Sequence, residues 1–116
     1  MADDRPLTQQ QIDLYLEALE LSEQDPSLPA LQDLVRAHLE RVPFENISKL
    51  YYMQRFGLKE MPPLERFLEG IRRYHFGGTC YSNNYYLNRL LLSLRYDVRL
   101  CGADMSSPDV HIVNIV

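Results

Sequence analysis

The sequence predicts an α+β fold, in which a helical bundle over residues 1–94 precedes the first strands of an incomplete sheet over residues 95–116. Two observations support this prediction. Before residue 95, apolar residues recur three and four positions apart, which is the spacing of one helix face. From Tyr96 onward the apolar residues alternate with polar ones, which is the spacing of a strand. The length of 116 residues, 46% of them hydrophobic, fits a single small globular unit.

The first two predicted helices have clear sequence signals at their ends. The first helix begins with a capping box, in which the Thr8 hydroxyl and the Gln11 side chain bind backbone amides of the first turn. Its apolar stripe consists of Ile12, Tyr15, Leu16 and Leu19. Pro26 and Pro29 separate it from the second helix, which ends near Pro43. That helix repeats the apolar spacing with Leu31, Leu34, Val35, His38 and Leu39.

Two more helices are predicted in the second half of the chain. Pro63 occupies a first-turn position of the third helix, which ends at the Gly77–Gly78 pair. Its apolar stripe consists of Leu64, Phe67, Leu68 and Ile71. The fourth helix extends from about Thr79 to Leu94. Residues 42–62 have no sustained period despite many apolar and aromatic side chains, and we expect a functional loop or an ordered cover there.

The last part of the chain is predicted to form a hairpin. One strand extends from Tyr96 to Cys101, Ser106 to Pro108 favour a turn, and a second strand extends from Asp109 to Val116. The second strand is apolar on both faces, which is typical of a strand that is covered on two sides. Two strands alone are marginally stable, and a helical bundle covers only one of their faces. We therefore expect the natural protein to continue beyond residue 116, or self-association or a second chain to complete the sheet.

Charge and composition exclude several classes of function. The 12 Lys and Arg residues against 16 Asp and Glu residues give a net charge of −4 and a pI of about 5.3, so nucleic acid is not an expected partner. The amino terminus is acidic where a secretory signal is basic, and no apolar run approaches the ~18 residues that span a bilayer. We therefore expect a soluble cytoplasmic protein with no membrane partner. In that compartment, Cys80 and Cys101 are expected to be thiols rather than a disulfide.

Cys80 is the first candidate for chemistry because of its position. It follows the flexible Gly77–Gly78 pair at the predicted start of a helix, where backbone amides and the helix dipole stabilise a thiolate. The two glycines would also let a substrate approach the backbone closely. A small buried residue after a helix end is the alternative interpretation, since thiols are among the most buried side chains.

His111 is the second candidate because a nucleophilic cysteine needs a nearby base. In the predicted last strand it shares a face with Val113 and Ile115, and a polar group among apolar neighbours needs a partner. A core histidine bonded to the backbone is the alternative interpretation. A third group should orient the imidazole, and the chain offers only weak candidates for it, which are Asp109, Asp104 and Asn114.

The remaining polar and aromatic residues are expected to be structural. His38 and His75 are interpreted as packing or surface residues, and Cys101 as an ordinary strand residue. No pair of cysteines or histidines has the short spacing of a metal site, so no metal is expected. Tyr81, beside the thiol, is a candidate wall for a ligand pocket. The tyrosines expected in the core or at its rim are Tyr51, Tyr52, Tyr74, Tyr81, Tyr85 and Tyr86.

Three segments together resemble the arylamine N-acetyltransferase family. Residues 39–47, Leu-Glu-Arg-Val-Pro-Phe-Glu-Asn-Ile, resemble its Pro-Phe-Glu-Asn segment. Residues 76–84, Phe-Gly-Gly-Thr-Cys-Tyr-Ser-Asn-Asn, resemble its Arg-Gly-Gly-aromatic-Cys-aromatic-Glu-x-Asn nucleophile motif. Residues 110–113, Val-His-Ile-Val, resemble its base-bearing strand. The order and rough spacing of the segments also agree, and the resemblance covers nearly all of this chain but less than half of a usual family member.

The resemblance implies both a fold and an activity. The chain would form the helical first domain of such an enzyme and the opening strands of its second domain, an incomplete β-barrel. Cys80 would take an acetyl group from acetyl-CoA with His111 as the base, and would pass it to an arylamine, hydrazine or related small-molecule amine in a ping-pong scheme. The family's orienting aspartate lies farther along than this chain extends. Activity is therefore expected to require sequence beyond residue 116, and the 116-residue chain alone is expected to be inactive.

The chain departs from the family's nucleophile motif at two positions. Phe76 stands where the family has arginine, and Ser82 stands where it has glutamate. Those charged groups hold the family's nucleophile loop against the Pro-Phe-Glu-Asn segment, so Glu45 is expected to lack its usual partner. Three functions therefore stay open. They are an acetyltransferase portion, a diverged inactive relative that serves binding or assembly, and another cysteine acyl-transfer or hydrolytic enzyme.

Overall fold

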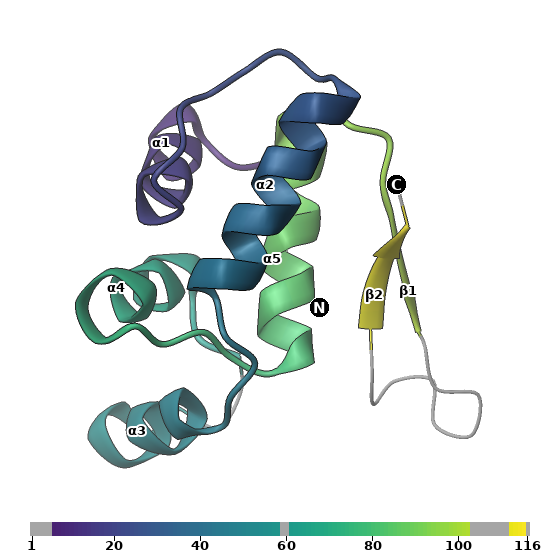
Figure 1. The fold of residues 1–116 in the computed structure, drawn as a ribbon. Coiled ribbons are helices and arrows are strands. Elements are labelled where there is room, and N and C mark those ends of the chain that lie inside the picture. The colour runs from purple at the N-terminus through teal and green to yellow at the C-terminus, as the bar shows by residue number, and fades with distance from the viewer. Residues whose placement is uncertain (1–5, 59–60, 103–111, 116) are drawn as a thin grey trace.

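Five helices and one antiparallel pair of strands make up the described part of the computed structural model, which covers residues 6–58, 61–102 and 112–115 (Figure 1). The elements are α1 (Gln9–Ala18), α2 (Leu28–Arg41), α3 (Ile47–Phe56), α4 (Leu64–Tyr74), α5 (Cys80–Ser93), β1 (Arg99–Gly102) and β2 (Ile112–Ile115). The register of the sheet pairs Arg99 with Ile115 and Gly102 with Ile112. The predicted α+β class is therefore confirmed.

The first two helices begin where their capping residues predict. Thr8 Oγ1 accepts a hydrogen bond from the Gln11 amide at 3.1 Å, and Gln11 Oε1 accepts one from the Thr8 amide at 2.9 Å. These reciprocal bonds form the predicted capping box. At the start of α2, Ser27 Oγ accepts a hydrogen bond from the Ala30 amide at 3.1 Å, and Pro29 lies in the first turn. Both helix starts therefore follow from local side-chain chemistry.

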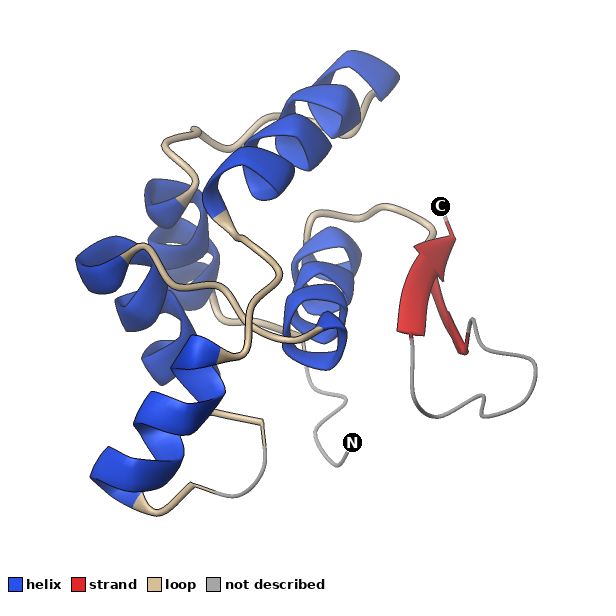
Figure 2. Cartoon of the chain, turned by 60° about the horizontal axis from the view of Figure 1, so that its bottom comes forward, coloured by secondary structure: helices blue, strands red, loops and turns tan. Residues whose placement is uncertain are grey.

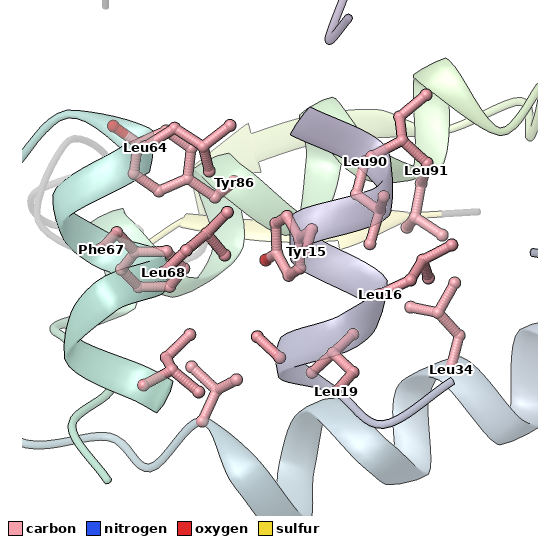
Figure 3. Packing of buried hydrophobic residues seen from close by; sticks show 14 of the residues in the cluster. Tyr15, Leu16, Leu19, Leu34, Leu64, Phe67, Leu68, Tyr86, Leu90 and Leu91 are labelled. Atoms are coloured by element: carbon pink, nitrogen blue, oxygen red, sulfur yellow. The ribbon is translucent and has the colours of Figure 1, made fainter. Parts of the chain in front are cut away.

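One apolar core joins the helices α1, α2, α4 and α5 (Figure 3). Tyr15 of α1 lies between side chains of α4 and Leu90 of α5, and Leu16 lies beside Leu34 of α2. Tyr15 and Leu90 have no exposed surface, and only 1% of Phe67 is exposed. The Phe67 ring centroid lies 6.3 Å from that of Tyr15 and 4.9 Å from that of Tyr86. Apolar burial at about 25 cal/mol per Å² makes this core the main source of the bundle's stability.

The outer face of α2 differs from the prediction. The apolar spacing places Val35 and Leu39 with the core residues, but 38% and 77% of their surfaces are exposed. His38, which belongs to the same predicted stripe, is buried, and its Nε2 shares a 2.9 Å hydrogen bond with the Tyr15 hydroxyl. The five residues of the predicted stripe span more than one helix face. Packing against α1 selects the side of α2 that carries Leu34 and His38.

The segment between α2 and α4 contains a helix that the apolar period does not reveal. This helix, α3, buries Ser48 and Tyr52, whereas 67% of Ile47 and 59% of Leu50 are exposed. A polar residue thus lies on the buried face and large apolar residues lie on the outer one, so no apolar stripe marks the helix. Gly57 ends it with a left-handed φ of 68°. That glycine is the sequence signal that could have located the helix end.

The third predicted helix ends earlier than expected. α4 stops at Tyr74, and the left-handed residue that follows it is His75, with a φ of 56°, rather than one of the two glycines. The Phe76 amide then donates a hydrogen bond to the Gly70 carbonyl at 3.0 Å. Gly77 and Gly78 consequently lie in the connection to α5 and do not cap α4.

The hairpin lies along α5, on the side of that helix that faces away from α1 and α4 (Figures 1 and 2). Asn114 Nδ2 donates a hydrogen bond to the Asn84 carbonyl of α5 at 2.9 Å. Ile115 of β2 is 57% exposed, so the predicted cover on both faces of the last strand is not seen for this residue. The turn predicted at Ser106 to Pro108 lies outside the described residues.

Candidate functional site

Cys80 is the first residue of α5, as the sequence predicts, and it is half-buried. The Asn83 amide donates to the Thr79 carbonyl at 3.0 Å and closes the first turn of the helix. The Thr79 side chain makes no capping hydrogen bond to this turn. Amides in the first turn of a helix have no partner within that helix and favour nearby negative charge.

Two chain segments meet immediately before Cys80, and we call residues 43–48 and 76–83 together the Cys80 clamp. Phe44 and Gly78 form a parallel bridge between the segments. The Glu45 amide donates to the Gly78 carbonyl at 3.1 Å, and the Gly78 amide donates to the Pro43 carbonyl at 3.2 Å. The segment that resembles Pro-Phe-Glu-Asn is therefore joined to the loop before Cys80 by backbone hydrogen bonds.

Glu45 keeps partners in the clamp although the expected arginine is absent. Its Oε1 accepts a hydrogen bond from the Ser48 amide at 2.8 Å, in the first turn of α3. Its Oε2 accepts one from the Gly77 amide at 3.1 Å. Two backbone amides thus bind the Glu45 carboxylate in place of the side-chain cation that is its usual partner in the family. A carboxylate at a helix start is also stabilised by the helix dipole.

Ser48 and Asn83 complete the clamp, and neither was singled out from the sequence. Asn83 Nδ2 lies 3.2 Å from the Pro43 carbonyl oxygen and 3.1 Å from the Gly78 carbonyl oxygen, and it donates to both. Ser48 Oγ donates to the Gly77 carbonyl at 3.4 Å. Asn83 lies within residues 76–84, which resemble the family's nucleophile motif, and that resemblance is the sequence signal that could have identified it. For Ser48 the sequence offers no comparable signal, because its contact is made across 29 residues.

Gly77 is required by a contact within the protein. A Cβ atom at this position would lie 1.9 Å from the Pro43 carbonyl oxygen, a distance that no side chain can tolerate. The expectation that these glycines let a substrate approach the backbone stays a prediction, since both of them also line a cavity. Gly78 is also tight, with a Cβ atom placed 3.0 Å from Ser82 Cβ.

Phe76, which stands where the family has arginine, belongs to an aromatic cluster. Its ring centroid lies 5.2 Å from that of Tyr74, 5.7 Å from that of Tyr51 and 6.0 Å from that of Tyr52. The Tyr52 hydroxyl donates to the Arg66 carbonyl at 3.0 Å, and burial raises the pKa of Tyr52 to about 12, so this hydroxyl stays protonated. Aromatic packing thus anchors the start of the loop before Cys80.

A cavity of about 270 Å³ lies between α3, Pro62 and the nucleophile loop. Ser82 lines it together with Tyr81, the residue predicted as a wall of a ligand pocket. Cys80 is not among the lining residues. The cavity therefore adjoins the backbone that carries the thiol, but does not open onto the thiol itself.

The partners predicted for Cys80 are not brought together in the described structure. His111, Asp109 and Asp104 lie outside the residues that the structure describes. Asn114, the remaining candidate orienter, is bonded to Asn84 of α5. The pairing of a base with Cys80 therefore stays a prediction.

The other histidines are structural or exposed. Burial lowers the pKa of His38 to about 4, so this side chain is neutral beside the Tyr15 hydroxyl. Burial likewise raises the pKa of Tyr15 well above its usual value. His75 is exposed at the end of α4. Within the described ranges, no three His, Cys, Asp or Glu side chains are grouped to hold a metal ion, and no helix is long and apolar enough to cross a bilayer.

Comparison with known proteins agrees with the resemblance seen in the sequence. The sequence pattern of the N-acetyltransferase family matches residues 27–113. An N-malonyltransferase of Gibberella moniliformis is 38% identical over 79 residues, which cover 68% of this chain and 22% of that protein. An arylamine N-acetyltransferase of Mycobacterium tuberculosis is 35% identical over 79 residues, which cover 68% of this chain and 26% of that protein.

A vertebrate relative extends the match slightly. The pineal gland isozyme of arylamine N-acetyltransferase from Gallus gallus is 33% identical over 88 residues, which cover 76% of this chain and 29% of that protein. The matched part of this chain thus spans less than a third of the length of each of these relatives.

Proposed function

This chain belongs to the arylamine N-acetyltransferase family, and we propose that it transfers an acetyl group from acetyl-CoA to an arylamine, hydrazine or related amine. The acetyl group passes through a thioester on Cys80. The observation that carries this proposal is the position of Cys80, which is the first residue of α5 and directly follows a loop that the Cys80 clamp holds. A thiol at a helix start, on a loop in one defined place, has the features of a cysteine nucleophile.

The proposed reaction has two halves that exchange one acyl group. In the first half, the Cys80 sulfur attacks the carbonyl carbon of acetyl-CoA, a new C–S bond forms, and the bond to the coenzyme sulfur breaks. The departing thiolate takes up the proton that Cys80 has lost. In the second half, the amine nitrogen attacks the same carbon, the C–N bond forms, and the Cys80 thiolate leaves. His111 serves as the base that takes a proton from Cys80 and then from the amine.

The two departures from the family motif are compatible with this function. The loop before Cys80 is held in place without the family's arginine and glutamate. Glu45 binds backbone amides, and Phe76 packs among aromatic rings. Removing both charges together avoids leaving either one unpaired. This observation supports an active enzyme over the alternative of a diverged relative that serves only binding or assembly.

We also propose that acetyl transfer needs residues beyond position 116. The relatives are more than three times as long as the part that this chain matches. In this proposal, residues 1–94 form the helical domain that carries Cys80, and residues 95–116 begin a β-barrel whose further strands cover β2. An aspartate from those strands orients His111. A second copy of the chain or another chain that completes the sheet is the competing arrangement.

Intact-mass spectrometry tests the thioester. After incubation with acetyl-CoA, the complete polypeptide should gain one acetyl group, the Cys80→Ala variant should gain none, and the Cys101→Ala variant should behave like the parent. His111→Gln should slow acylation. Malonyl-CoA is tested in parallel because one relative is an N-malonyltransferase. An unmodified parent with both donors would favour the inactive relative, and an adduct that survives in Cys80→Ala would remove Cys80 as the nucleophile.

A further inference from the structure

The cavity beside the Cys80 clamp has no role in the acetyl-transfer scheme. Its volume is about 270 Å³, and its apolar walls come from Tyr52, Met61 and Pro62. On another side it is bounded by Thr79, Tyr81 and Ser82 at the start of α5. It is smaller than most cofactor sites, which occupy roughly 300–1,000 Å³, and its size suits a ligand with about one ring.

Ser82 is a polar group in this cavity without a partner. Only 5% of the residue is exposed, and it lines the cavity. No residue that the structure describes makes a hydrogen bond with its Oγ atom. Ser82 Oγ is not one of the fully buried unpartnered atoms, so it keeps surface that faces the cavity, where a ligand or water can bind it. A longer side chain at this position, such as glutamate, would fill the same space.

The polar part of the cavity favours an anion. Thr79, Tyr81 and Ser82 lie at the amino-terminal end of a 14-residue helix, where backbone amides and the helix dipole attract negative charge. Lys49 of α3 adds an ammonium group to the lining, and no described residue forms an ion pair with it. Glu45 and Glu69 are nearby opposing charges. Both oxygens of Glu45 already bind the amides of Ser48 and Gly77, and Glu69 is paired with Arg66 at 3.4 Å.

We propose that this cavity is a binding site for a small aromatic carboxylate. The ring lies against Tyr52, Met61 and Pro62, and the carboxylate accepts hydrogen bonds from Ser82 and the first turn of α5 beside Lys49. Because Gly77 and Gly78 form part of the wall, an occupant contacts the loop that carries Cys80 without contacting the thiol. The site is separate from the acyl-transfer chemistry, so the proposal goes beyond that function.

Titration of the ¹⁵N-labelled chain with sodium benzoate, followed by amide NMR, tests the site. We expect saturable shifts centred on Gly78, Tyr81 and Ser82, with a dissociation constant of about 1 mM for so small a ligand. Benzamide has the same shape without the charge and should bind about tenfold more weakly. Aniline should behave like benzamide.

Variants separate the contributions to binding. Ser82→Leu fills the cavity and should abolish saturation, whereas Ser82→Ala keeps the space, removes the hydroxyl and should weaken binding about threefold. Lys49→Met should weaken it by a similar factor, and Arg36→Met, on the exposed face of α2, should leave it unchanged. If Ser82→Leu disturbs the fold, Ser82→Ala and Lys49→Met still decide the question.

Three outcomes would overturn the proposal. They are shifts that do not saturate with benzoate, equal binding of benzamide or aniline, and saturable binding that survives in both Ser82→Ala and Lys49→Met. None of these measurements involves acyl transfer. Failure of this site therefore leaves the thioester on Cys80 standing, and failure of the thioester leaves the site standing.

Discussion

The apolar core and the Cys80 clamp are held together by different interactions. The core around Tyr15, Phe67 and Leu90 depends on the removal of apolar surface from water. The clamp is held mainly by hydrogen bonds to backbone groups and by a contact that only glycine allows at Gly77. Burial is non-directional, whereas hydrogen bonds and close backbone contacts fix geometry. The stability of this protein and the placement of Cys80 are therefore separable.

The largest expected effect comes from the core. Phe67→Ala removes a ring that is 99% buried between α1 and α5, and should lower the free energy of unfolding by about 4 kcal/mol. The rate at which iodoacetamide modifies Cys80 should change little in the fraction that stays folded. Chemical denaturation and alkylation kinetics measure the two quantities. Leu39→Ala, on the exposed face of α2, is the control and should cost less than about 0.5 kcal/mol.

Gly77→Ala should affect the clamp more than the core. Its Cβ atom would lie 1.9 Å from the Pro43 carbonyl oxygen, so the two segments must separate. We expect a loss of about 3 kcal/mol together with a change in Cys80 alkylation. Gly57→Ala is the matched control, because its φ is 68° but nothing lies within 4 Å of the new atom. It should cost about 1 kcal/mol and leave the alkylation rate unchanged. Equal effects at the two glycines would contradict the contact.

His38 should make the stability of the core depend on pH. Its pKa is about 4 in the folded protein and about 6.5 when the chain unfolds, so the unfolded state binds more protons between these values. Stability is therefore complete above about pH 6.5 and falls as the pH decreases toward 4. The loss at pH 5 should be roughly 2 kcal/mol. Denaturation at pH 7 and pH 5 measures it, and His38→Gln should remove this component. An unchanged difference in that variant would assign the dependence to other groups.

The smallest expected effect tests one carboxylate of the clamp. Glu45→Gln keeps the shape of the side chain but removes the charge, and its amide nitrogen is unable to accept the hydrogen bond that a carboxylate oxygen accepts. The change should cost about 1 kcal/mol and alter Cys80 alkylation, because the bonds to Ser48 and Gly77 both weaken. Glu40→Gln, on the exposed part of α2, is the control. A loss of stability without any change in alkylation would show that Glu45 stabilises α3 only.

Much of the fold was predictable because its signals are local. The capping box at Thr8, the apolar spacing of α1 and α4, and the start of α5 at Cys80 each depend on residues within a few positions of one another. The helix α3 was missed because its buried face carries Ser48 and its exposed face carries Ile47. Residues that lie far away in the sequence pack against α3 and determine which of its faces is buried.

In the candidate site, too, the local features were predictable from the sequence and the long-range contacts were not. The position of Cys80 followed from the two glycines before it and the helical spacing after it. The partners of Glu45 did not, because they are amides separated from it by as many as 32 residues. The sequence located the departures at Phe76 and Ser82 and predicted that Glu45 lacks its usual partner. Only the structure shows the aromatic packing at Phe76 and the cavity at Ser82.

The sequence by itself determined the α+β class, the family and the placement of Cys80 at the start of a helix, because periodicity, capping and short motifs act over a few residues. Only the tertiary structure decided that Pro43 lies against Gly77, that backbone amides bind Glu45, and that a cavity opens beside Ser82. These features come from segments about thirty residues apart, and their contacts depend on how the packed helices bring those segments together.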